Sequence, residues 1–291
     1  MNIFFRIEGG LGKHIASTAV IKAIKNKYPK DDLYVFSAYP DVFLNNPYIF
    51  KNHTLDQLNG IYDRLVEGKP FKAFLSEPYK HHSFINHNKH LIKVWCEMFD
   101  VPYRGEVPEI YLTQAEIDYF TPFYKKTDKP LFILHPNGGP GNQGFNYSWT
   151  RDIPEPIVHS IIEEFSPTHT MVHIKRQGQK EYPNTLHAMD GYRSIAILLL
   201  LSDKRLLIDS FSQHLAKALK LKSTVCWVTT PPEVFGYQLH DNILANPFTK
   251  RPITTHAVFE PFQLAQDISS LAYNNINEIF DVNKIIASLK K

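Results

Sequence analysis

The sequence contains few cysteines, no long apolar run and little excess charge of either sign. Its 291 residues include two cysteines, Cys96 and Cys226, which lie far apart and lack metal-binding spacing. The longest apolar run, Ile195 to Leu201, is too short to span a bilayer, and the N-terminus lacks the long apolar segment of a signal peptide. A net charge of +3 is far from the dense basic stripe of a dedicated nucleic-acid binder. We therefore expect a cytoplasmic protein with free thiols, and leave open a peripheral association with the inner membrane.

The composition is that of a globular protein, with 43% hydrophobic and 21% charged residues. The strand pattern of residues 2–7, a glycine loop, the helical pattern of 13–28 and a strand at 32–37 form a β-loop-α-β unit. A second alternating series begins after the charged break at 125–130. The predicted fold is α/β, with two Rossmann-like domains of parallel sheet that face each other across a cleft. The expected parts are an N-terminal domain (1–128), a C-terminal domain (129–274) and a terminal helix (275–291) with the option of packing back on the first domain.

The glycine loop reads IEGGLGKH, from Ile7 to His14, and superficially resembles a phosphate-binding loop. A Walker loop requires a glycine at the position of Ile7 and a hydroxyl at the position of His14, so the match fails where the chemistry needs it. The dinucleotide pattern fails as well, because Ile15 stands where its third glycine belongs. Glycines between a strand and a helix still allow a close approach of the backbone to an anion or a polar substrate. The alternative is a simple tight turn.

A second motif follows the predicted strand at 205–208. Asp209 and Ser210 end this strand and are suited to cap the next helix, whose first N–H groups could bind a diphosphate. His214 lies one turn into that helix and could donate a hydrogen bond to the same group. The alternative is a capped helix with an incidental histidine.

Several segments, in this order, resemble the glycosyltransferases of GT-B architecture and in particular the ADP-heptose:lipopolysaccharide heptosyltransferase family (family 9). GGLGKHIASTAVIKAIKNKYP resembles their first loop and helix, and LFILHPNGG resembles the strand and loop that begin their donor domain. YSWTRDIPEPIVHSIIEEF resembles the segment that follows, and the run from Asp209 to Ala218 resembles their Asp-Ser/Thr-Gly-x-x-His-Leu-Ala-x-Ala motif. The resemblance covers most of the chain.

The resemblance implies an enzyme that transfers a sugar from a nucleotide-diphosphate sugar to an acceptor hydroxyl, with inversion and without a metal or other cofactor. The second domain would bind the donor and the first domain the acceptor, which could be a lipopolysaccharide core, another bacterial surface glycan or a hydroxylated base of phage DNA. No obligate protein partner is inferred. The predicted donor-binding residues are Asn137, Trp149, Arg151, Lys175, Asp209, Ser210, His214 and Thr229.

The chain departs from the family pattern at positions that matter for catalysis. The first loop of the family ends in an aspartate that acts as general base, and Lys13 occupies that position here. A lysine is protonated near neutral pH and cannot accept a proton unless it is strongly desolvated. Lys13 is therefore predicted to bind an anion, with Glu8 and His14 as candidate bases from the same loop.

Two departures concern the donor side. Phe211 replaces the glycine of the Asp-Ser/Thr-Gly turn, and the lysine that precedes the family's tryptophan is missing before Trp149. Lys175 and Arg176 could supply the lost positive charge. A different donor or acceptor from the usual heptose chemistry is therefore expected.

Acceptor contacts are predicted at Gly10, Gly12, Lys80 and His82, the last two in a basic, histidine-rich segment that could also be a solvated face. No metal site is predicted, because these histidines lack carboxylate or cysteine partners at suitable spacing. The alternative function is a non-catalytic nucleotide-sugar or glycan-binding protein on the same scaffold, which Lys13 favours because it replaces the expected base.

Overall fold

The structure is a computed structural model that describes residues 1–56, 58–75, 77–86, 89–125, 128–138, 150–188, 191–247 and 273–291. The chain divides into two compact units, Met1–Leu112 and Thr113–Lys291. The division falls one helix before the charged break at 125–130 that the sequence indicated. The reason lies in α4 (Gln114–Tyr124), whose Glu116 and Tyr124 bond Arg193 and Ser194 of the second unit.

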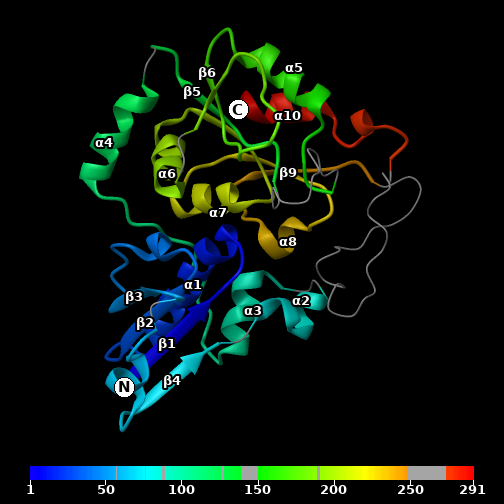
Figure 1. Cartoon of the computed structure of the whole chain (residues 1–291). Helices are drawn as coiled ribbons and strands as arrows, with labels where there is room; N and C mark the ends of the chain where they lie inside the picture. The colour runs from blue at the N-terminus through cyan, green and yellow to red at the C-terminus, as the bar shows by residue number, and fades with distance from the viewer. Residues whose placement is uncertain are drawn as a thin grey trace. The chain divides into compact units, whose positions relative to one another are not determined.

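The first unit contains a parallel sheet with strand order β3-β2-β1-β4 (Figure 1). Its elements are β1 (Asn2–Ile7), α1 (Leu11–Lys27), β2 (Asp32–Ser37), η1 (Pro40–Phe43), β3 (Lys51–Thr54), η2 (Tyr62–Val66), β4 (Phe71–Phe74), η3 (Pro78–Lys80), α2 (His82–Ile85) and α3 (Leu91–Met98). The predicted β-loop-α-β unit is thus present at 2–37. The strands β3 and β4 were not predicted, because each has only four residues and KNHT carries no apolar alternation.

The side chains of β1 point alternately to the two faces of this sheet. Phe5 packs against Trp95 of α3 with ring centroids 6.0 Å apart, on the face that α1 and α3 cover. Phe4 lies on the opposite face in a cluster with Tyr34 and Phe36, which the segment 55–66 covers. Because side chains alternate along a strand, the apolar run IFF (Ile3–Phe5) is buried on both sides of the sheet, whereas Arg6 is exposed.

The second unit contains a parallel sheet with strand order β10-β9-β8-β5-β6-β7. Its elements after α4 are β5 (Leu131–Leu134), α5 (Glu155–Phe165), β6 (Thr170–His173), β7 (Thr185–His187), α6 (Tyr192–Leu201), β8 (Lys204–Ile208), α7 (Phe211–Ala218), β9 (Thr224–Trp227), α8 (Pro232–Phe235), β10 (Asp241–Leu244), η6 (Ile276–Glu278) and α10 (Val282–Leu289). All strand pairs given for the two sheets are parallel, which confirms the predicted α/β class.

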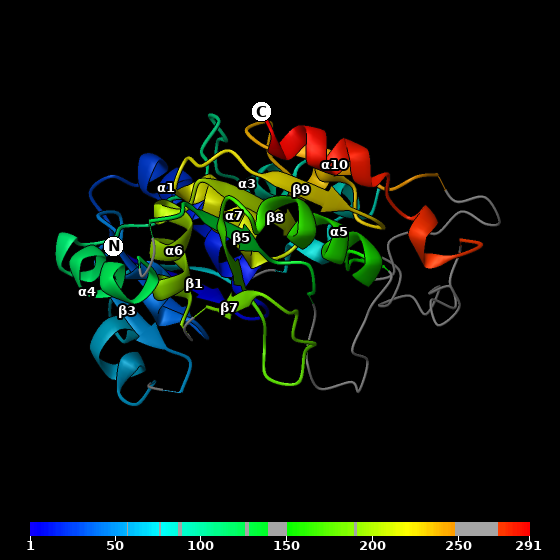
Figure 2. The same ribbon diagram turned by 90° about the horizontal axis from the view of Figure 1, so that it is seen from above.

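The C-terminal helix α10 belongs to the core of the second unit. Ile285 and Leu289 are buried in the same cluster as Phe132, Leu134 and Ile208 of the sheet, and α10 contacts α5 (Figure 2). The helix α10 thus packs within its own unit. The helix is also shorter than the predicted terminal helix (275–291), because Asp281 caps a new helix start and leaves only the turn η6 before it.

Candidate functional site

Parallel sheets bind ligands beyond the carboxyl ends of their strands, at the point where the strand order reverses. In the first unit this point lies between β1 and β4, because the chain runs from β1 outward to β2 and β3 and then returns to the other side of β1. The loops that follow β1 and β4 meet there. A cavity of about 260 Å³ opens at this place, lined by Arg6, Ile7, Glu8, Lys13, Leu75, Glu77 and Trp95.

Lys13 is buried at the inner wall of this cavity. Its side chain is 7% exposed, and its Nζ forms an ion pair with the Glu77 carboxylate, which the sequence analysis did not single out. The ammonium also lies 5.3 Å from the ring centroid of Tyr79 and 5.7 Å from that of Trp95. A cation with a carboxylate and two aromatic faces around it is held in one position. Lys13 therefore meets a carboxylate of the protein at the place where the sequence predicted an anionic ligand.

His14 lies inside α1 rather than in the cavity wall. Its side chain is inaccessible to solvent, its Nδ1 bonds the Gly10 carbonyl oxygen at 3.0 Å, and its ring stands against Tyr39. Burial, which is the largest cause, lowers the pKa of the imidazole. Nε2 is enclosed without a hydrogen-bond partner among the described residues. Since a base must reach the acceptor hydroxyl, this position favours a structural role for His14.

The remaining predicted residues of the first unit are exposed, except Gly12, which is half-buried. Glu8 extends into solvent with its side chain 58% accessible, and it pairs with Arg6, which is also exposed. Gly9 adopts φ +92°, and Gly10 is the N-cap residue of α1, with Gly12 in its first turn. Lys80 and His82 are exposed on η3 and α2, beyond the side chains that line the cavity.

In the second unit the strand order reverses between β5 and β8. The loop after β5 carries Asn137 and Gly138, which are held by the buried Asp152: its carboxylate accepts a bond from the Gly138 N–H at 2.9 Å and from the Asn137 amide at 3.1 Å. Sequence reasoning missed Asp152, although it lies in the quoted segment YSWTRD. The side-chain amide oxygen of Asn137 (Oδ1) is buried and has no partner among the described residues.

Arg151 lies directly over this loop. A Cβ added at Gly138 would come within 2.8 Å of Arg151 Cδ and 3.0 Å of Ile208 Cδ1, so glycine allows the two segments to approach. Among the described residues, no carboxylate lies within ion-pair distance of the Arg151 guanidinium. The loop therefore combines an uncompensated cation with a tightly held backbone.

The loop after β8 leads into α7. Ser210 is the extended N-cap residue (φ −156°, ψ 179°) but forms no side-chain cap hydrogen bond, and Asp209 accepts a bond from the Thr230 hydroxyl at 2.5 Å. The expected capping by these two side chains is therefore absent from this part of the structure. No residue of this turn needs a positive φ, so Phe211 replaces the family's glycine without backbone strain and rests against the His135 ring.

His214 is buried, and its ring forms a hydrogen bond within the second unit. Its Nδ1 bonds the Tyr237 hydroxyl at 2.7 Å, so its ring is oriented by a residue that the sequence did not single out. Thr229 contacts Thr150, because both its N–H and its hydroxyl donate hydrogen bonds to the Thr150 carbonyl oxygen. The neighbouring His135 Nδ1 lies 2.6 Å from the Ser212 hydroxyl, and burial lowers its pKa to about 3.

Lys175 follows β6 and is paired with Glu181 at 2.5 Å. Beside it His173 is inaccessible to solvent, and both of its ring nitrogens lack partners among the described residues. Its pKa is lowered to about 4, mainly because of burial and then because of His187 and Lys175. Trp149, the remaining predicted donor residue, lies outside the described residues.

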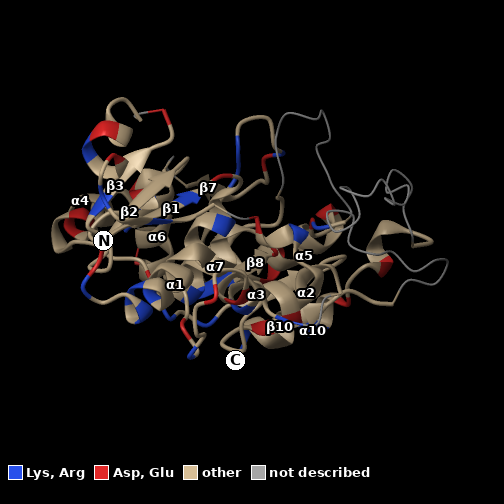
Figure 3. Cartoon of the chain, turned by 90° about the horizontal axis from the view of Figure 1, so that it is seen from below, with Lys and Arg blue, Asp and Glu red and all other residues tan. Residues whose placement is uncertain are grey.

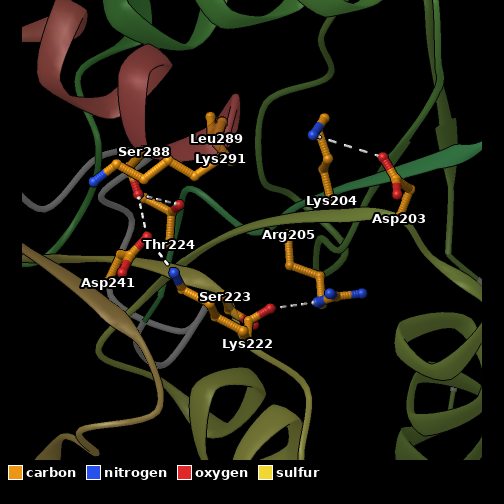
Figure 4. A pocket seen from close by; sticks show the side chains of 10 residues that line it. All are labelled: Asp203, Lys204, Arg205, Lys222, Ser223, Thr224, Asp241, Ser288, Leu289 and Lys291. Atoms are coloured by element: carbon orange, nitrogen blue, oxygen red, sulfur yellow. Dashed lines mark hydrogen bonds and ion pairs between the residues drawn. The ribbon is translucent and has the colours of Figure 1, made fainter.

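A second hollow, of about 230 Å³, lies at the amino ends of β8, β9 and β10 (Figure 4). Its charges are partly satisfied within the fold: Lys222 pairs with Asp241 at 3.1 Å, and the Arg205 guanidinium donates to the Lys222 and Ser202 carbonyl oxygens. Parallel sheets carry their ligands at the other end. We therefore assign this hollow to the framework rather than to the reaction site.

Two absences hold for the part of the chain that the structure describes. No group of three or more His, Cys, Asp and Glu side chains is arranged to hold a metal ion. No described helix has both the length and the apolar character needed to cross a membrane.

Comparison with known proteins yields matches among solved structures. No protein-family model and no curated protein sequence matches the chain. A family 9 glycosyl transferase from Veillonella parvula DSM 2008 superposes with a TM-score of 0.72 at 11% identity, over 99% of this chain and 96% of its own. E. coli ADP-heptose lps heptosyltransferase II gives 0.63 at 10% identity, over 100% and 99%.

A third match is the iron-containing dodecameric glycosyltransferase TibC from enterotoxigenic E. coli H10407. It gives a TM-score of 0.62 at 13% identity, over 99% of this chain and 76% of its own. A structure of iron-containing heptosyltransferase TibC in complex with ADP-D-beta-D-heptose gives 0.64 at 12% identity, over the same shares. The chain thus has, over nearly its whole length, the fold of family 9 glycosyltransferases and ADP-heptose heptosyltransferases, as its sequence resemblance predicts.

Proposed function

We propose that the protein is a glycosyltransferase that moves a sugar from a nucleotide-diphosphate sugar to an acceptor hydroxyl. The observation that carries this proposal is the whole-chain similarity in fold to glycosyltransferases, one of which was solved with ADP-D-beta-D-heptose. Each unit also offers a polar site at the point where its strand order reverses.

The donor is assigned to the second unit. The diphosphate would lie against the start of α7, where the first backbone N–H groups of a helix lack intrahelical partners, and Arg151 would pair with it. An arginine without a carboxylate partner in the described part of the chain suits this role, because its planar guanidinium binds phosphate oxygens in pairs. Stabilising the leaving diphosphate in this way lowers the barrier to loss of the nucleotide.

The acceptor is assigned to the cavity of the first unit. Transfer would be a single displacement at the anomeric carbon with inversion, in which the diphosphate leaves as the acceptor oxygen attacks. Positioning, proton removal and charge stabilisation would then be the contributions of the protein, without a metal. Acidic and basic residues are mixed along the described chain (Figure 3), which favours a glycan acceptor over the backbone of phage DNA.

The test is to measure nucleoside diphosphate release from a panel of nucleotide sugars that includes ADP-heptose, in the presence of EDTA. Lipopolysaccharide core oligosaccharides and hydroxymethylated DNA serve as acceptors, and NMR gives the anomeric configuration of the product. We expect turnover without added metal and an inverted product. Arg151→Ala should raise the Kd for the nucleoside diphosphate at least tenfold, whereas Arg104→Ala in the first unit serves as the matched control.

The second candidate is a non-catalytic nucleotide-sugar or glycan-binding protein, and the burial of Lys13 at the expected base position favours it. Binding of a nucleotide sugar without product formation across the whole acceptor panel would support this candidate and refute the transferase. Mg²⁺-dependent hydrolysis of ATP or GTP would refute both.

A further inference from the structure

Two carboxylates line the first-unit cavity, and they differ in how firmly they are held. Among the described residues Glu8 pairs only with the exposed Arg6, and an ion pair between two solvated side chains contributes little to fixing either one. Glu77 follows β4 and is 36% exposed, so it is reachable from the cavity while its Oε2 bonds the buried Lys13. Only Glu77 is therefore both accessible and fixed.

The surroundings of Glu77 restrict it further. Its Oε1 accepts a bond from the Tyr79 N–H at 3.4 Å, at the start of η3. The ammonium that it meets is itself confined by the rings of Tyr79 and Trp95. A carboxylate held at both oxygens but open to a cavity is preorganised to receive a proton from a bound group.

Trp95 forms part of the wall of the same cavity. Its side chain is 1% exposed, and its ring centroid lies 5.7 Å from the Lys13 ammonium that pairs with Glu77. A sugar hydroxyl bound in this cavity could donate its proton to the nearby carboxylate.

We propose that Glu77 is the general base of the transfer reaction and that Lys13 is its positioning residue. This inference rests on the proposed function. The acceptor O–H bond would break with transfer of its proton to the Glu77 carboxylate, while the oxygen forms the bond to the anomeric carbon of the donor. The bond from that carbon to the diphosphate breaks, and the nucleoside diphosphate leaves with the electron pair. Glu77 afterwards returns the proton to solvent.

This assignment accounts for the lysine at the position where the resemblance predicts an aspartate. The carboxylate comes from the segment after β4 rather than from the start of α1, and its ion pair with Lys13 fixes its position at the cavity. It also leaves His14 in a structural role, since that ring is enclosed and does not line the cavity.

The experiment compares Glu77→Gln with the wild type, using the nucleotide sugar and the acceptor from the panel that give the fastest turnover. Glu77→Gln keeps an oxygen for Lys13 but cannot take a proton, so kcat should fall by about 10²- to 10⁴-fold. The KM for the donor should change less than threefold. Glu97→Gln is the matched control, because Glu97 is also a partly exposed partner of a lysine in this unit, Lys89.

Three readouts separate a base from a structural residue. The acid limb of the pH profile of kcat/KM should be present in the wild type and absent in Glu77→Gln; the charged groups that face this carboxylate are Lys13, Arg6 and Glu8. Added formate should restore part of the activity of Glu77→Ala but none of that of Lys13→Met. Thermal unfolding of each variant shows whether the chain remains folded, and Glu77→Asp provides a conservative variant that retains the carboxylate.

The outcomes distinguish a failure of the Glu77 assignment from a failure of the proposed function. If the wild type transfers sugar and Glu77→Gln retains more than a tenth of kcat with an unchanged pH profile, the assignment of Glu77 is wrong while the transferase stands. A larger loss in Glu8→Gln than in Glu77→Gln would move the base to Glu8. If the wild type produces neither transfer nor donor hydrolysis with any member of the panel, the proposed function fails and this inference fails with it.

Discussion

The buried His173 makes the second unit sensitive to acid, and the size of this effect follows from its surroundings. Burial lowers its pKa from 6.5 to about 4, so the folded ring stays neutral at pH 5 while the unfolded ring is protonated. The free energy of unfolding therefore keeps its full value with respect to His173 above pH 6.5, and it decreases as the pH falls toward 4 because the unfolded state binds the proton more readily. At pH 5, 1.5 units below the unfolded pKa, the loss amounts to about 2 kcal/mol at 1.36 kcal/mol per unit.

Replacing this ring by a side chain of similar size removes the effect. In His173→Leu, the free energy of unfolding should fall between pH 7.5 and pH 5.0 by about 2 kcal/mol less than in the wild type. The variant should also be no less stable at pH 7.5, because two buried nitrogens without partners among the described residues disappear.

Urea unfolding at the two pH values measures this difference. The chain has three tryptophans, so a Trp95→Phe, Trp149→Phe background leaves the buried Trp227 of β9 as a fluorescence reporter of the second unit. The partly exposed His159 provides the control variant His159→Gln, which should keep the acid sensitivity of the background. Equal acid losses with and without His173 would show that the ring is not held neutral by burial, and would refute this reasoning.

Three further predictions concern the second unit. Asp152→Ala should lower the free energy of unfolding by about 2–4 kcal/mol in urea titrations, because two bonds to a buried carboxylate are lost; an unchanged midpoint would contradict this. Gly138→Ala should weaken nucleoside diphosphate binding by roughly 3- to 10-fold in calorimetry, because the added Cβ displaces Arg151, whose flexible end limits the damage. Glu116, whose pKa the hydrogen bond from Arg193 lowers to about 2, stabilises the fold above its ordinary pKa of 4.5. Glu116→Gln should therefore cost about 1 kcal/mol at neutral pH, discounted for partial exposure, and thermal scans should show the difference vanishing as the pH approaches 2.

The local sequence determined the elements that carry strong apolar patterns. The strand at 2–7 and the helix after the glycine loop were predicted within a few residues, because their side chains are buried along a strand or around a helix. The capping box at Thr113 and Glu116 is likewise set by hydrogen bonds between residues close in the sequence. The alternation of these elements was enough to predict two parallel sheets.

The tertiary structure decided what the site residues do. Whether Lys13 meets a ligand or a protein carboxylate depends on Glu77, which is 64 residues away in the chain and follows a strand that sequence pattern did not reveal. His14 and His214 belong to the predicted motifs, yet the enclosure of one and the Tyr237 contact of the other follow from packing. Sequence periodicity specifies which side of an element is apolar, whereas the partner of a charged group is set by the strand order that brings distant loops together. The order of residue types along the chain therefore predicted the fold. The candidate base Glu77 became apparent only from the tertiary structure, in which β4 lies beside β1.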